Sequence, residues 1–95
     1  MRNYEVAFIV HPEVEEAAFA ALVEKVQGWV TAAGGQVVKT DIWGRRHLAY
    51  PIRKQNEGQY VLLEAQLESQ VTRDIERNLR LTEQVLRFQI IRTDA

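Results

Sequence analysis

Residues 36–67, QVVKTDIWGRRHLAYPIRKQNEGQYVLLEAQL, contain two strand-like segments with a turn signal between them. In the first segment, residues 37–52, the apolar side chains share one parity, which is the pattern of a strand with one buried face. These side chains are Val38, Ile42, Leu48, Tyr50 and Ile52. Residues 60–67 return as a second strand, and the polar cluster at 55–58 is typical of a turn. We therefore expect a long β-hairpin in which Gly44 marks a bulge or a close backbone approach.

A helix and a strand are predicted on the N-terminal side of this hairpin. Apolar residues recur with helical spacing over residues 13–33, and Gly34 and Gly35 end that pattern. The residues on this helical face are Phe19, Leu22, Val23, Val26, Val30 and Ala33. Residues 2–10 alternate with period two and end before Pro12, so they predict a strand.

The C-terminal side repeats this arrangement. Ser69 is a fair N-cap for a helix over residues 70–81, whose narrow apolar stripe is Val71, Ile75 and Leu79. Residues 85–91 read as the last strand. The order β-α-β-β-α-β predicts an α+β, ferredoxin-like sandwich in a single domain, residues 1–95, with a four-stranded antiparallel sheet and two helices on one face.

The sheet face opposite the helices is then left uncovered. If Tyr4, Phe8 and the residues of their parity point toward the helices, the intervening side chains point away from them. The strand parity assigns to this uncovered face Asn3, Glu5, Ala7, Ile9, Leu62, Glu64, Gln66, Arg87, Gln89 and Ile91. Such a mixture of polar and apolar residues is more typical of a contact surface than of a purely solvated one.

Composition excludes several classes of protein. The chain has 95 residues and no cysteine, so disulfides and thiolate chemistry are absent and the commonest soft zinc ligand is missing. No apolar run approaches 18 residues, and the N-terminus makes a poor secretory signal. A soluble, cytoplasmic protein is expected.

Neither a catalytic centre nor a cofactor site is indicated. The two histidines, His11 and His47, lack the spacing of metal ligands, and Gly34-Gly35 follows a helix instead of opening one. The glutamates at residues 13–16 are best explained as the solvated start of a helix. We expect no enzyme activity, no metal and no cofactor.

Positive charge gathers in the hairpin although the chain as a whole has net charge −1. Arg45, Arg46, Arg53 and Lys54 lie in a stretch of 15 residues, 42–56, that contains no acid. Charges on an edge strand also protect a sheet edge from aggregation, which is the alternative explanation. The long absence of acids favours an anionic partner, and a few phosphate contacts would make binding sensitive to salt.

Residues 44–53, GRRHLAYPIR, resemble the signature of the bacterial small-subunit ribosomal protein six family: a glycine, a basic residue, a polar residue, then Leu-Ala-Tyr-x-Ile and a basic or small residue. The similarity extends to the opening residues 1–5, to Gly34-Gly35, to Gly58 and to the arginine-rich last strand. The resemblance implies the same sandwich fold. It also implies a structural role in the 30S ribosomal subunit, with 16S ribosomal RNA and the eighteenth small-subunit ribosomal protein as partners.

The resemblance also suggests which residues make these contacts. The residues expected to bind RNA are Arg2, Arg46, Arg87 and Arg92, which match basic positions of the family, and Arg45, Arg53 and Lys54, which match less constrained positions. Those expected to contact the partner protein, in a heterodimer, are Tyr4, Trp43, Leu62, Gln89 and Ile91. The competing hypothesis is a regulatory or dimerisation module of the same fold that pairs through its uncovered sheet face or its long hairpin. The apolar patch Ile9, Leu62 and Ile91 supports this hypothesis. A stable homodimer in size-exclusion chromatography would favour that alternative.

Overall fold

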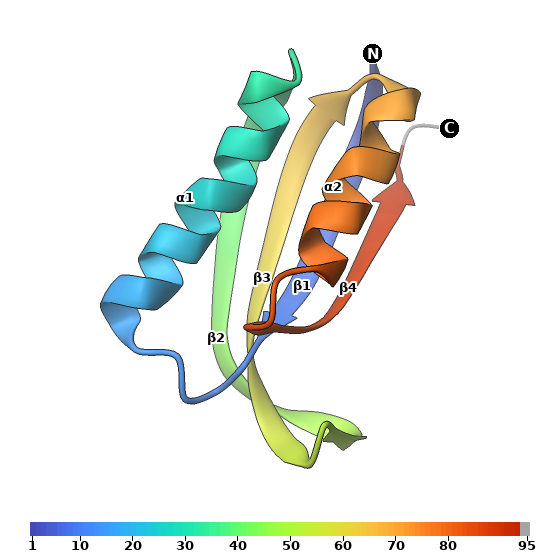
Figure 1. The fold of residues 1–95 in the computed structure, drawn as a ribbon. Helices are drawn as coiled ribbons and strands as arrows, with labels where there is room; N and C mark the ends of the chain where they lie inside the picture. Colours follow the sequence, from blue (N-terminus) through green and yellow to red (C-terminus); the bar gives the residue numbers. More distant parts are fainter. Residues whose placement is uncertain (94–95) are drawn as a thin grey trace.

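The computed structural model describes residues 1–93 and has the predicted order of elements. They are β1 (Arg2–Val10), α1 (Glu16–Ala32), β2 (Gln36–Ile52), β3 (Gln55–Leu67), a 3-10 turn (Ser69–Val71), α2 (Thr72–Arg80) and β4 (Val85–Arg92). The strands form one antiparallel sheet in the order β2-β3-β1-β4. Both helices lie on the same face of the sheet (Figure 1), which confirms the ferredoxin-like sandwich. No helix within residues 1–93 is long and apolar enough to cross a membrane.

The core lies between the helices and the sheet and follows the predicted parity. Val6, Phe8 and Val10 of β1 are at most 1% exposed, and Leu63 and Leu67 of β3 are fully buried beside them. The helices contribute the residues of their apolar stripes, namely Phe19, Leu22, Val23, Val26, Val30, Ile75 and Leu79. A period of two on the strands and of about 3.6 on the helices therefore produces a single core.

Both helices begin later than the sequence predicts. Residues 13–15, which were expected to be helical, form a turn before α1. In this turn the Val14 amide donates to the His11 carbonyl, and the Glu13 amide donates to His11 Nδ1. Before α2, Ser69 makes no side-chain cap and instead begins the 3-10 turn, and its carbonyl accepts a bond from Thr72 Oγ1 at 2.8 Å. In each case a local turn satisfies the backbone groups that a longer helix would otherwise use.

The hairpin turn is not at residues 55–58, where it was predicted. It consists of Arg53 and Lys54, which both have positive φ angles, 49° and 65°, and β3 already begins at Gln55. Such a two-residue turn with left-handed residues matches the twist of the flanking strands. Gly58 is instead needed where strands pack closely, because an added Cβ would overlap Ile9 Cγ2.

The bulge predicted at Gly44 is confirmed, since the pairing of β2 with β3 shifts between Ile42 and Gly44, and Gly44 has a φ of 80°. Beyond the bulge, the hairpin overhangs the body of the sheet and bends toward β4 (Figure 1). The prediction that Tyr50 anchors this segment in the core is wrong, because Tyr50 is 55% exposed and only Leu48 and Ile52 are half-buried. Val38 and Ile42 are also exposed, since they lie on the edge strand.

The junction between α1 and β2 gives a stability prediction. A Cβ on Gly35 would lie 2.6 Å from Leu67 Cδ2 and 2.7 Å from the Gln66 carbonyl oxygen. Because backbone must move to relieve that contact, we expect Gly35→Ala to lower the free energy of unfolding by about 1–3 kcal/mol in urea titrations.

Gly28→Ala is the matched control, since Gly28 lies inside α1 with open space where its Cβ would be. We expect this substitution to raise stability by about 1 kcal/mol through helix propensity. Equal destabilisation by both substitutions would contradict the close packing at Gly35.

Candidate nucleic-acid interface and sheet-face groove

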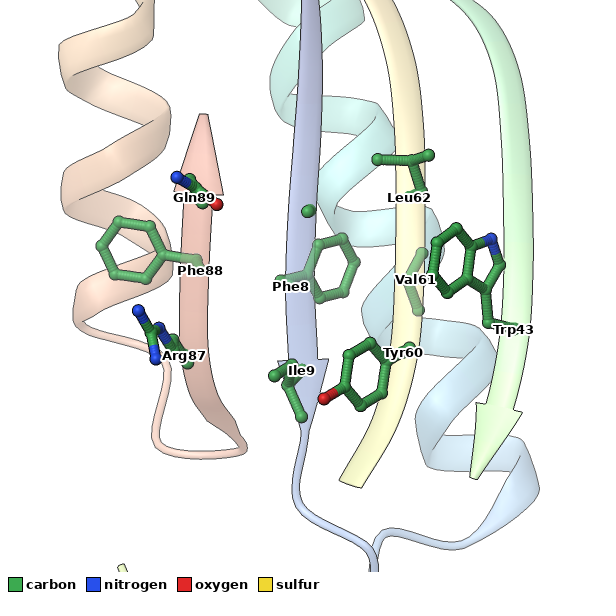
Figure 2. A pocket seen from close by; sticks show the side chains of 10 residues that line it. Phe8, Ile9, Trp43, Tyr60, Val61, Leu62, Arg87, Phe88 and Gln89 are labelled. Atoms are coloured by element: carbon green, nitrogen blue, oxygen red, sulfur yellow. The ribbon is translucent and has the colours of Figure 1, made fainter. Parts of the chain in front are cut away.

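The sheet face opposite the helices, called here the open face, has a shallow groove of about 160 Å³. Figure 2 shows side chains from all four strands around it, among them Ile9, Trp43, Tyr60 and Gln89. Trp43 is 52% exposed, and its ring stacks on Tyr60 with a centroid separation of 6.4 Å and an interplanar angle of 5°. Trp43 points to this face because the preceding Ile42 pairs with the inward-pointing Val61, so an edge strand contributes a large aromatic side chain to the groove.

Four of the five residues predicted to contact a partner protein lie on the open face. Trp43, Leu62 and Gln89 line the groove together, and Ile91 is on the same face because it pairs with the outward-pointing Glu5. Tyr4, the fifth residue predicted to contact the partner, does not lie on the open face. It is only 8% exposed and lies in the core, because its parity on β1 directs the ring toward the helices.

The seven cations predicted to bind RNA do not form one patch. Arg45, Arg46, Arg53 and Lys54 belong to the overhanging hairpin, and Arg87 lies at the nearby start of β4. Arg2 and Arg92 lie at the other end of the sheet, at the start of β1 and the end of β4. Figure 1 shows the start of β1 and the end of β4 at the top of the view, opposite the hairpin.

Arg45 has a structural role that the sequence did not indicate. Its Nη2 donates to the Pro12 carbonyl at 2.7 Å, and its Nη1 lies 3.6 Å from Glu57 Oε1. The expectation that this arginine has no acid nearby is therefore wrong, because the antiparallel pairing brings Glu57 back beside it. Gln59 Nε2 also donates to the His11 and Val14 carbonyls, so the hairpin base holds the β1–α1 loop.

Arg53 and Arg87 connect the far end of the hairpin to β4. Arg53 Nη2 donates to the Glu83 carbonyl at 3.0 Å and to the Val85 carbonyl at 2.7 Å. Arg87 Nη1 donates to the Tyr50 hydroxyl, and its guanidinium lies 5.9 Å from the centre of the Tyr50 ring. The exposed position of Tyr50 is thus explained by a contact with a cation on the neighbouring strand.

Arg46 and Lys54 differ from these residues because their side chains make no hydrogen bond or ion pair within residues 1–93. Both side chains are exposed. Arg46 pairs with Gly58 across the hairpin. The charge of these residues is therefore available to an external anion.

Arg80 is a further cation at this end of the molecule, and sequence reasoning did not select it. Its guanidinium lies 5.8 Å from the centre of the Phe88 ring, and its Nη2 lies 3.2 Å from Glu76 Oε1. It shares a cleft with Arg53 and Arg87. The sequence does not show that Arg80 lies near the hairpin, because only the fold brings the end of α2 there.

No metal-binding site is evident in the part of the chain that the structure describes. Residues 1–93 contain no group of three or more His, Asp or Glu side chains close enough together to hold a metal ion. What the described residues offer is an apolar groove on one face and a cationic surface at the hairpin end.

Comparison with known proteins identifies the family. Residues 3–92 match the family model described as Ribosomal protein S6. Small ribosomal subunit protein bS6 of Clostridium novyi is 45% identical over 91 residues, 96% of this chain and 96% of that protein. The protein of the same name from Moorella thermoacetica is 43% identical over 94 residues, 99% of this chain and 96% of that one. A crystal structure of 30S ribosomal protein S6 from Thermotoga maritima superposes with a TM-score of 0.93 at 33% identity, covering 97% and 87% of the two chains. The chain therefore belongs to the ribosomal protein S6 family.

Proposed function

We propose that the chain is a structural constituent of the small ribosomal subunit, in the cytoplasm. There it binds the central domain of 16S ribosomal RNA together with the eighteenth small-subunit ribosomal protein. The observation that carries this proposal is the family match over residues 3–92. That family consists of ribosomal proteins and not of enzymes, in agreement with the prediction that the chain has no catalytic activity.

The RNA surface in this proposal is the hairpin end of the molecule. Arg46 and Lys54 carry exposed charges without partners among residues 1–93, and Arg87 adds a third cation from β4. Contacts of this kind to phosphate groups position a protein but do not read the base sequence. Arg2 and Arg92 are proposed to form a second, smaller RNA contact at the opposite end of the sheet.

The protein partner in this proposal covers the groove on the open face. Trp43 and Leu62 offer apolar surface there, while Gln89 and Arg87 offer polar groups at its border. This combination of an aromatic centre and a polar rim is typical of protein interfaces. The shape of the RNA and the bound partner would then supply the specificity that phosphate contacts lack.

The dimerisation module remains the second candidate, because the same groove could bury a second copy of the chain. Ile9 and Leu62 line the groove, and Ile91 is 44% exposed on the same face. A monomer in size-exclusion chromatography, forming a one-to-one complex when the partner protein is added, would support the ribosomal role. A stable homodimer that excludes the partner would support the module.

Arg46 is the residue that tests the RNA surface. We expect Arg46→Ala to weaken binding to a central-domain 16S RNA fragment, in the presence of the partner protein, by about 3- to 10-fold at moderate salt. The slope of log affinity against log salt should fall by about 1, because one phosphate contact is lost. The thermal unfolding midpoint should be unchanged, since the exposed Arg46 side chain makes no hydrogen bond or ion pair among residues 1–93.

Arg73→Ala is the control for this measurement. Arg73 is an exposed cation on α2, so its removal changes the net charge by the same amount on the helix side of the molecule. Loss of affinity to the same extent in both variants would mean that only net charge matters, and this would contradict a hairpin contact.

A further inference from the structure

A cleft separates the far end of the hairpin from the turn between α2 and β4. Its volume is about 470 Å³, and the side chains of Arg53, Arg80 and Arg87 line it from three different elements. Arg53 comes from the hairpin turn, Arg80 from the end of α2 and Arg87 from β4. Residues separated by up to 34 positions in the sequence thus converge on one hollow.

The cleft has a small net positive charge. The hydrogen-bond acceptors of Arg53 are two backbone carbonyls, and that of Arg87 is a phenol hydroxyl, so neither guanidinium is neutralised by its partner. Arg80 shares its charge with Glu76, and Glu83 is the acid that lines the cleft itself. Three guanidinium groups are therefore balanced by two carboxylates, which leaves a net charge of about +1.

The two guanidinium groups are also held in place before any ligand arrives. Both bonds of Arg53 are made by Nη2, so its remaining N–H donors can each reach only a single anion oxygen. Arg87 uses only Nη1, so its parallel Nε–H and Nη2–H pair remains free to donate to an anion. Arg87 is fixed by the Tyr50 hydroxyl and lies against the Tyr50 ring. Fixed guanidinium donors are well suited to oxygens of phosphate groups, because two parallel N–H bonds can reach two oxygens.

We propose that this cleft is a preformed site for a phosphodiester of bound RNA, assembled by Arg53 and charged by Arg80 and Arg87. Arg53 acts as a positioning residue, since its two carbonyl bonds fasten the hairpin end to the α2–β4 turn and so keep Tyr50 against Arg87. The proposal rests on the RNA-binding role proposed above and adds Arg80 to it. Arg53 then holds the hairpin end to the α2–β4 turn through its hydrogen bonds and does not act only as a positive charge.

The fastening is tested first in the protein without RNA. We expect Arg53→Ala to increase amide hydrogen exchange of residues 48–57 by about tenfold or more, because two hydrogen bonds from a charged group are lost. Lys54→Ala is the matched control: it removes the same charge from the adjacent turn position, also at positive φ, but breaks no hydrogen bond among residues 1–93. Equal exchange in both variants would overturn the positioning role.

The phosphodiester site is tested by binding of the central-domain 16S RNA fragment with the partner protein present. We expect Arg80→Ala and Arg87→Ala each to weaken binding several-fold and to reduce the salt slope by about 1. Arg53→Lys keeps the charge but replaces the planar donor, so it should recover little of the affinity that Arg53→Ala loses. Full recovery by lysine would show that Arg53 contributes charge alone.

The two possible failures are distinguishable. If the unaltered protein and its partner bind the RNA but Arg80→Ala leaves affinity and salt slope unchanged, the cleft is not the phosphate site and the proposal is overturned while the RNA-binding role stands. If the unaltered protein fails to bind the RNA with its partner present, the RNA-binding role and this site both fall.

Discussion

Phe8→Ala should lower the free energy of unfolding by about 3–5 kcal/mol, which is the range for removing a buried phenylalanine. Phe8 is 1% exposed and lies in the C-terminal half of β1, paired with Val61 of β3 and Phe88 of β4. Its ring points into the layer between the sheet and the helices. A domain of this size is stable by only a few kcal/mol more than that loss, so the variant should be largely unfolded in mild urea.

The neighbouring residue provides the control for this prediction. Ile9 points to the open face and is only half-buried, so Ile9→Ala should cost clearly less in the same urea titration. The comparison tests the strand parity on which the open face depends. If the substitution at Ile9 were as damaging as that at Phe8, the division of β1 into a core side and an open side would be wrong.

Trp43→Ala should weaken binding of the eighteenth small-subunit protein by about 2 kcal/mol or more, roughly 30-fold, which is the loss expected for a central aromatic residue of an interface. Trp43 is the large aromatic side chain that is more than half exposed in the groove, and its stacking on Tyr60 fixes its orientation before binding. An aromatic ring held in this way loses little conformational freedom on association. Isothermal titration calorimetry with the purified partner would measure the change.

Ile42→Ala is the control for Trp43. Ile42 is 57% exposed on the adjacent position of β2, but it pairs with the inward-pointing Val61 and so lies on the helix side of the sheet. We expect this substitution to leave the affinity for the partner nearly unchanged. Equal weakening by both substitutions would argue that the partner covers the strand edge and not the groove.

Strand β1 and the sandwich topology were predictable because their patterns are short-range and unambiguous. Large apolar residues recur at every second position from Tyr4 to Val10, and the observed strand has the predicted bounds. The same alternation assigned Ala7, Ile9, Leu62 and Gln89 to the open face, where the structure places them. The alternation predicts the direction of these side chains correctly because helices cover one face of the sheet and leave the other open.

The hairpin turn illustrates where such reasoning fails. The sequence signal at residues 55–58 came from polar residues and a glycine, which are typical of turns. The actual turn uses Arg53 and Lys54 in left-handed conformations, an uncommon choice for long side chains. Gly58 is a glycine because the Ile9 side chain lies too close for a Cβ at this position. The local sequence does not distinguish a glycine required by such packing from a glycine required by a turn.

The candidate site was predictable in composition but not in arrangement. The basic hairpin was evident from the missing acids, yet only the cross-strand pairing reveals that Glu57 lies beside Arg45. Tyr4 was expected at the partner interface although its own parity buries it. Arg80 could not be selected, because the closeness of α2 to the hairpin end is a property of tertiary packing.

The central claim is that this chain binds 16S ribosomal RNA as one half of a heterodimer. The most direct test is binding to a central-domain RNA fragment between about 50 and 200 mM salt, with and without the eighteenth small-subunit protein. For about five phosphate contacts, we expect weak binding alone and tight binding with the partner that falls about 10²- to 10³-fold across this range. An affinity that is the same with and without the partner, or that does not change with salt, would contradict it.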